Sequence, residues 1–130
     1  GKEPFWNAIA GSIAASIKRG RAGEAWTARS FRVAAAVAEI TVDFTNAIFE
    51  EPEVALQFQG LIGDVDVVVP EDVGLMVDAQ AAIGELRVAG ERAAGFGNRF
   101  VWRSPNYDTA ENRVRLEMMY AVADVNVKVL

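Results

Sequence analysis

Hydrophobic and polar residues alternate with a period of two over most of the chain after residue 36. In the first such stretch, Ile40, Val42 and Phe44 alternate with the polar residues Thr41, Asp43 and Thr45. The same alternation recurs at residues 54–59, 65–69, 73–79, 86–88, 114–120 and 125–129. Alternation of this kind is typical of β-strands with one buried face. The pattern therefore predicts a mainly β protein.

One six-residue phrase occurs four times, and each copy opens one of these alternating stretches. It reads apolar, small, acidic, and then two apolar residues with one variable residue between them. The copies are Val37-Ala38-Glu39-Ile40-Thr41-Val42, Ile62-Gly63-Asp64-Val65-Asp66-Val67, Ile83-Gly84-Glu85-Leu86-Arg87-Val88 and Val122-Ala123-Asp124-Val125-Asn126-Val127. A phrase that recurs in this way indicates that one structural unit is stacked several times.

The alternating stretches are of two types, those that a copy of the phrase opens and those that lie between copies, and the two types follow each other about ten residues apart. Two architectures fit this arrangement. One is a meander of hairpins closing into a sandwich or barrel. The other, which we favour, is a short single-stranded β-solenoid of about four coils, in which like strands stack in parallel. A solenoid places equivalent corners above one another, and this explains why the same phrase recurs. We expect the solenoid domain over residues 36–130, with an insertion at residues 90–112 that breaks the alternation.

The preceding residues 1–35 are expected to form an N-terminal helix and a linker. Apolar residues at steps of four, Phe5, Ile9, Ile13 and Ile17, predict an amphipathic helix over residues 5–19. This helix could pack on the rest of the domain. Alternatively, residues 5–21 could lie on a membrane surface, with Trp6 and basic residues at the interface. Residues 20–30 read as a linker that Trp26 anchors to the core.

Aromatic and basic residues gather in the insertion and form our candidate partner surface. They are Phe96, Arg99, Trp102, Arg103 and Tyr107. Aromatic residues and arginine are enriched among the residues that dominate binding energy at protein interfaces. The alternative is that the aromatic side chains pack in the core, as such residues commonly do.

The four phrases also contain residues that we expect at the corners of the solenoid, where they could have a structural or a chemical role. They are Glu39, Gly63, Asp64, Gly84, Glu85 and Asp124. Glycine at positions 63 and 84 suits a corner that needs positive φ or close approach. If coils stack, the carboxylates form a column with about 5 Å between neighbours. Such a column could bind Ca²⁺, or each carboxylate could accept hydrogen bonds at its own turn, which we favour.

Composition and charge narrow the function classes. The chain has no cysteine and no histidine, so disulfides, cysteine zinc sites and histidine bases are excluded. The net charge of -5 argues against nucleic acid as a partner. Six basic and two acidic residues give residues 1–35 a charge of +4, which leaves -9 on the rest. We expect no catalytic residues, no metal and no cofactor.

Several short stretches along the chain match the pattern of one known protein family. They are Ile40-Thr41-Val42-Asp43-Phe44-Thr45-Asn46-Ala47, Leu61-Ile62-Gly63-Asp64-Val65, Val69-Pro70-Glu71-Asp72-Val73, Ile83-Gly84-Glu85-Leu86-Arg87-Val88, Gly90-Glu91, Gly95-Phe96-Gly97-Asn98-Arg99, Ser104-Pro105-Asn106-Tyr107 and Val122-Ala123-Asp124-Val125. Through these stretches the chain resembles, over about residues 24–130, the C-terminal domain of LiaF-like, cell-wall-active antibiotic response proteins of the toastrack group. The combination is specific, although each piece alone is weak.

The resemblance implies a bacterial, membrane-attached protein whose soluble part is a short β-solenoid, which we place on the cytoplasmic side. It implies a non-enzymatic role in envelope-stress signalling, with a histidine kinase or response regulator as partner. One alternative is a self-associating scaffold at the membrane face, since open solenoid ends invite pairing. A remote alternative is a carbohydrate-acting enzyme that would use Asp64 and Glu85.

Overall fold

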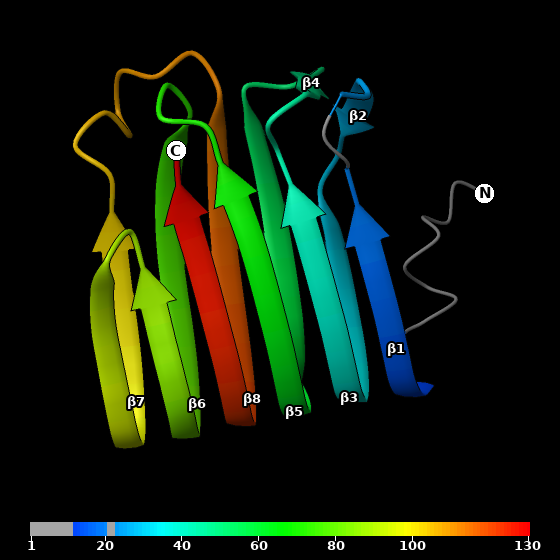
Figure 1. The fold of residues 1–130 in the computed structure, drawn as a ribbon, viewed down its shortest axis with the longest axis vertical. Helices are drawn as coiled ribbons and strands as arrows, with labels where there is room; N and C mark the ends of the chain where they lie inside the picture. Colours follow the sequence, from blue (N-terminus) through cyan, green and yellow to red (C-terminus); the bar gives the residue numbers. More distant parts are fainter. Residues whose placement is uncertain (1–11, 21–22) are drawn as a thin grey trace.

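The computed structural model describes residues 12–20 and 23–130, and for residues 12 and 93–98 it describes the backbone alone. All regular secondary structure in this part of the chain is β-strand. The strands are β1 (Ser12–Arg19), β2 (Trp26–Ala28), β3 (Phe31–Asp43), β4 (Ala47–Phe49), β5 (Glu53–Val69), β6 (Gly74–Val88), β7 (Glu91–Arg103) and β8 (Arg113–Val129). Six of them form one sheet in the order β1-β3-β5-β8-β6-β7, and β2 pairs with β4 (Figure 1). The prediction of a mainly β protein is confirmed.

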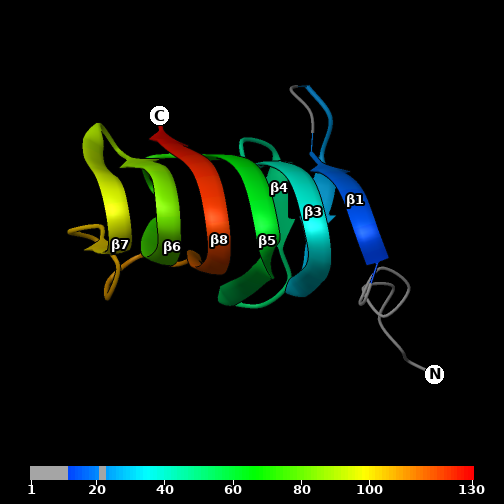
Figure 2. The same ribbon diagram turned by 90° about the horizontal axis from the view of Figure 1, so that it is seen from below.

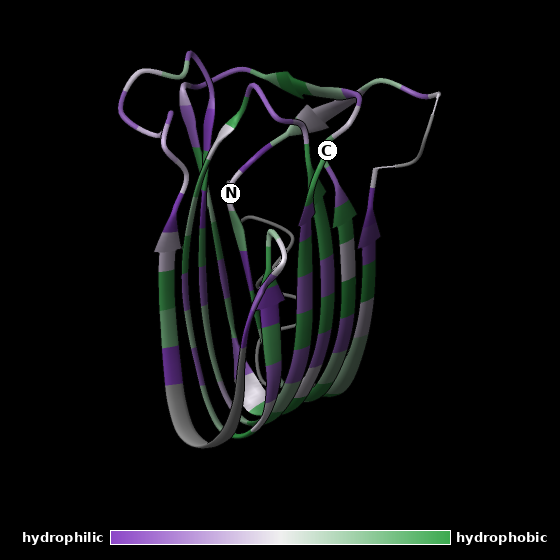
Figure 3. Cartoon of the chain, turned by 60° about the vertical axis from the view of Figure 1, so that its left-hand side comes forward, coloured by the Kyte–Doolittle hydropathy of each residue, from purple (hydrophilic) through white to green (hydrophobic). Residues whose placement is uncertain are grey.

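The long strands of the sheet are bent into a U, so that each contributes two limbs to the fold (Figures 2 and 3). In β3, Phe31, Val33 and Ala35 are buried before the bend, and the even-numbered residues from Ala38 on are buried after it. This shift leaves two consecutive residues, Ala36 and Val37, outside the bend. The two strand types expected from the sequence are therefore the two limbs of one continuous bent strand.

The four copies of the phrase lie side by side in register on parallel strands. Glu39 pairs with Asp64, Asp64 with Asp124, and Asp124 with Glu85. The other positions of each phrase, from its first apolar residue to its last, are paired in the same register. The expected parallel stacking of like strands is confirmed, and it gives the sheet a solenoid-like form.

The order of the strands is not the order of the chain. β8, which carries the fourth copy, lies between β5 and β6, which carry the second and third copies. β7 pairs antiparallel to β6 and forms one end of the sheet. The insertion at residues 90–112 thus contains a 13-residue strand and the loop that leads back to the middle of the sheet.

The predicted N-terminal helix over residues 5–19 is wrong for residues 12–19, and residues 5–11 lie outside the described part. Residues 12–19 form β1, which pairs in parallel with β3. Its residues 14–19 align with the first phrase, and Ser16 stands opposite Glu39. Apolar residues spaced four positions apart lie on one face of a helix, and they also lie on one face of a β-strand, where every second residue points the same way. The spacing therefore did not distinguish helix from strand. The expected boundary between residues 35 and 36 accordingly falls inside β3.

The core fills the space between the two limbs. Its members are mainly aliphatic side chains from both limbs, together with Met118 and the aromatic residues Phe31, Phe44, Phe58 and Tyr120. At the open end of the U, Trp26 packs against Phe44 with 5.6 Å between ring centroids. Its Nε1 donates a hydrogen bond to the Asp43 carbonyl at 2.9 Å, so Trp26 anchors β2 to the core, as expected.

Candidate functional site

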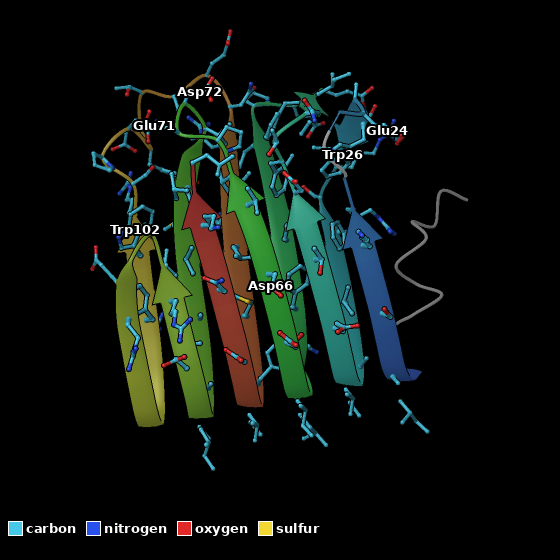
Figure 4. The ribbon with its side chains drawn as sticks, viewed as in Figure 1. Glu24, Trp26, Asp66, Glu71, Asp72 and Trp102 are labelled. Carbon is cyan, nitrogen blue, oxygen red and sulfur yellow. The ribbon has the colours of Figure 1, made fainter. Side chains whose placement is uncertain are left out.

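The aromatic residues of the insertion belong to the end of the core. Trp102 on β7 stands opposite the buried Val77 of β6, and it is half-buried against the core (Figure 4). Its Nε1 donates a hydrogen bond to Glu91 Oε2 at 2.9 Å. Phe100, two residues earlier on the same face of β7, also packs against the core. The side chain of Phe96 lies outside the described part.

Tyr107 is buried in the loop after β7. Its hydroxyl donates a hydrogen bond to Glu53 Oε2 at 2.7 Å. Burial and this hydrogen bond raise the pKa of the Tyr107 phenol above its usual value. The guanidinium carbons of Arg103 and Arg113 lie 5.0 and 5.8 Å from the ring centroid, within cation-π range. Tyr107 therefore fastens the loop to the start of β5.

The basic residues of the insertion face outward from β7. Arg99 donates two hydrogen bonds to the Asp78 carboxylate, at 3.2 and 3.0 Å, and this pairing raises the Arg99 pKa. Arg103 forms an ion pair with Asp108. Between them, Val101 is 59% exposed. The structure thus divides the candidate partner surface. Its described aromatic members pack inward, and an exposed face of Arg99, Val101 and Arg103 remains.

A shallow groove of about 340 Å³ continues this face across the first limb of the sheet. Its floor carries polar side chains from neighbouring strands, among them Gln57, Glu117 and Asp78. Gln57 donates a hydrogen bond to Glu117 at 3.1 Å. The groove therefore offers an ordered polar surface beside the exposed face of β7.

The acidic residues of the four phrases form one continuous row on the outside of the second limb, which we call the acidic row (Glu39, Asp64, Asp124 and Glu85). Glu85, at one end, is bound by Arg87 at 2.6 Å and by Arg92 at 3.2 Å. Glu39, Asp64 and Asp124 have no ion pair among the described residues. The row therefore carries uncompensated negative charge over three neighbouring strands.

Asp66 lies beside this row on β5 (Figure 4). Burial raises its pKa, and the nearby charges of Asp64, Asp124 and Glu39 add to the shift. No group of acidic residues in the described part has a geometry suited to a metal ion. Asp64 and Glu85, the pair considered for glycoside chemistry, stand on either side of Asp124, and both oxygens of Glu85 are taken by guanidinium groups.

The small residues of the phrases lie inside the bend, where space is minimal. A Cβ on Gly63 would come within 2.6 Å of the Tyr120 ring. Gly84 has φ of +139°, and a Cβ there would lie 1.9 Å from the Ala123 carbonyl oxygen. Tyr120 is 4% exposed, and its hydroxyl has no hydrogen-bond partner among the described residues. Burial raises the pKa of Tyr120 to about 12.

Sequence reasoning missed a row of exposed apolar residues outside the bend. At each of five neighbouring strands, two consecutive residues face outward, and all ten are apolar. We call this row the apolar ridge: Ile13-Ala14, Ala36-Val37, Leu61-Ile62, Ala121-Val122 and Ala82-Ile83. The phrase itself could have indicated this row. Its first apolar residue lies two positions before the acidic residue, so in a strand both side chains point to the same, exposed face.

Comparisons with known proteins agree with the architecture. Residues 16–127 match the family described as cell wall-active antibiotics response LiaF, C-terminal. The protein LiaF of Bacillus subtilis is 27% identical over 92 residues, which are 71% of this chain and 38% of that protein. A crystal structure from Clostridium sporogenes, described as a cell adhesion protein, has a TM-score of 0.55 at 14% identity. It covers 76% of this chain and 54% of that one, and it supports the fold alone.

The described residues contain no helix long and apolar enough to cross a membrane. The family match covers most of the bent sheet, from within β1 to near the end of β8. All four phrases fall inside it. This chain belongs to the LiaF-like C-terminal family of cell-wall-active antibiotic response proteins.

Proposed function

We propose that this domain is a non-enzymatic regulatory module of a bacterial envelope-stress response. It acts by protein-protein contact with a two-component signalling system, through the histidine kinase or its response regulator, on the cytoplasmic side of the membrane. Membership of a family named for the response to cell-wall-active antibiotics supports the physiological setting. The match spans 38% of the length of the Bacillus subtilis relative, and membrane attachment of the protein to which this domain belongs is part of the proposal.

The exposed face of β7 is the observation that carries this proposal. Val101 presents an apolar side chain between Arg99 and Arg103, and both guanidinium groups are already held by carboxylates. Ion pairs of this kind fix the arginines before a partner arrives and so reduce the entropy lost on binding. β7 is also an outer strand, with β6 as its one neighbour in the described sheet. An edge strand can accept an added strand from a partner.

A pull-down with the purified cytoplasmic part of a kinase encoded beside such a protein tests this surface. We expect the double substitution Arg99→Ala and Val101→Ser to reduce the retained kinase at least tenfold. Trp102→Ala is a poorer probe, because Trp102 packs on the core and its loss would disturb the sheet as well. Ile48→Ser is the matched control, since Ile48 is a similarly exposed aliphatic residue on β4. Equal retention of the kinase by both variants would refute this surface.

Self-assembly into a scaffold is the second candidate, and the two open ends of the sheet favour it. β1 and β7 each have one neighbour in the sheet, so each has an edge that no other described strand pairs with. Pairing of these edges between copies would extend the sheet. Light scattering over a concentration series tests this directly. A mass that stays monomeric at every concentration excludes the scaffold and leaves the signalling module unaffected.

A further inference from the structure

The apolar ridge is a continuous surface at the bend of the sheet. Val37, Ile62, Val122 and Ile83 pair with one another across four strands, and Ala14 of β1 extends the row. These four branched side chains are 42–49% exposed, and Leu61 and Ile13 are 61% and 81% exposed. Carbon-only side chains project beyond the bends at the lower end of the strands in Figure 4. Scattered exposed hydrophobic residues are common, but a contiguous row indicates a binding surface.

Core packing does not explain why the outside of the bend is apolar. The residues that face inward at the same place, such as Ala38 and Ala123, are buried, and the ridge residues are their outward neighbours. Polar side chains at these outward positions would leave the core unchanged. The strands lie about 4.8 Å apart, so five of them give the ridge a length of about 19 Å. An α-helix of about 13 residues has the same length.

The two flanks of the ridge differ in charge. On one side the acidic row runs parallel to the ridge, two residues further along each strand, and three of its four carboxylates have no ion pair among the described residues. The nearest outward positions on the other side include the neutral residues Gln59, Met119 and Gln80. A complementary partner would present an apolar stripe bordered on one side by basic residues. A basic amphipathic helix has this pattern.

The spacing of the ridge also suits a helix laid along it. One helical turn rises about 5.4 Å, close to the 4.8 Å between strands, so successive turns can rest on successive strands. The other occupants fit less well. Anionic lipid would be repelled by the acidic row. A second copy would present the same ridge with its own acidic row, in which three of the four carboxylates have no ion pair among the described residues, and so would add mainly negative charge.

We propose that the apolar ridge and the acidic row together form a docking surface for a basic amphipathic helix of about 13 residues from another protein. The apolar face of the helix covers Ile62, Val122 and Ile83, and its basic residues contact Asp64 and Asp124. The inference goes beyond the proposed function, because it requires neither a kinase nor β7. Failure of one surface in the experiments therefore leaves the other standing.

The test is binding of a synthetic 14-residue leucine-lysine amphipathic peptide to the full chain, measured by fluorescence anisotropy at several salt concentrations. We expect micromolar binding that weakens as salt rises. Ile62→Ser with Ile83→Ser should weaken it at least tenfold. Asp64→Asn with Asp124→Asn should weaken it about fivefold at low salt and flatten the salt dependence. The same peptide with glutamate in place of lysine should not bind.

Control variants stand away from the ridge. Glu71→Gln with Asp72→Asn removes two exposed charges at the opposite end of the strands (Figure 4), and Ile48→Ser removes an exposed aliphatic side chain from β4. Both should bind the peptide like the unmodified chain. Circular dichroism melting of each variant establishes that the fold is intact, since all these side chains are exposed or partly exposed.

Four results would overturn the proposal. The first is equal peptide binding by the ridge variants and the unmodified chain, or no peptide binding at all. The second is binding to neutral lipid vesicles, but not to the peptide, that the ridge substitutions abolish. The third is concentration-dependent dimerisation that is lost in the ridge variants. The fourth is peptide binding that begins only after residues 1–11 are removed, which would identify the chain's own segment as the occupant.

Discussion

The inner and outer sides of the bend place adjacent residues of the same phrase in opposite environments. Inside, Gly63 and Gly84 lie against a ring and a carbonyl oxygen, with no room for a side chain. Outside, Ile62 and Ile83 are nearly half-exposed. The inner positions are explained by packing, whereas the outer ones contribute little to the core. The repeated phrase therefore encodes a fold on one side and, by our inference, a binding surface on the other.

The largest effect is expected inside the bend, for Gly84→Val. The new Cβ would meet the Ala123 carbonyl, and a β-branched residue is strained at φ of +139°. We expect a loss of about 3 kcal/mol or more in the free energy of unfolding, measured by denaturant titration. Ile83→Val, the adjacent outward change, should leave it within about 0.5 kcal/mol. Equal losses at the two positions would contradict the contrast between the sides.

Alkaline pH should act on the inside of the bend through Tyr120. Its phenol stays neutral in the folded chain up to a pKa of about 12, while in the unfolded chain it ionises near 10. Stability is therefore unaffected below pH 10 and falls between pH 10 and 12, by about 2–3 kcal/mol from this group. Tyr120→Phe should lack that part of the loss. Because the hydroxyl has no hydrogen-bond partner in the described part of the chain, this variant should also be about 1 kcal/mol more stable at pH 7. Identical pH profiles for the two proteins would refute this.

Gly63→Ala should have an intermediate effect, because the atom it meets belongs to a side chain. The Tyr120 ring, 2.6 Å from the added Cβ, must shift. We expect a loss of about 1–2 kcal/mol in thermal or chemical unfolding. In a Tyr120→Leu background the same substitution should cost less than half as much. A cost that does not change in that background would show that the ring is not the obstacle.

The smallest effect is expected outside the bend, for Leu61→Ala. Leu61 is largely exposed, so its truncation leaves no cavity and should change stability by less than about 0.5 kcal/mol. Leu116→Ala, the same change at a fully buried position of β8, should cost about 2–5 kcal/mol. A large loss at Leu61 would mean that the ridge is covered within the folded chain.

The stacking of the phrases was predictable, because each copy places small, acidic and apolar residues at the same positions. The neighbour order was not, because nearly identical phrases fit beside one another in any sequence, and this left the place of β8 undetermined. The strand character of residues 12–19 was missed because Ile13 and Ile17 satisfy both periods, and because Ser16 and Arg19 depart from the phrase.

The candidate partner surface was predicted only in part. Arginine and aromatic residues were identified in the right segment, but alternation along β7 sends Trp102 inward and Val101 outward. Residue type alone suggested the opposite, since tryptophan is the more frequent interface anchor. Alternate residues of β7 face the core, as they do in the paired strand β6, and following this alternation would have separated the two faces of β7. The same alternation within each phrase would have revealed the apolar ridge.

The position of β8 has a consequence for how the protein is made. The strands β1, β3 and β5 on one side and β6 and β7 on the other are joined in the sheet through β8. While the ribosome is still adding residues 113–129, β5 and β6 each have a long edge without its neighbour. Such edges can pair with other nascent chains, so the interval before β8 emerges is when this protein is most exposed to aggregation.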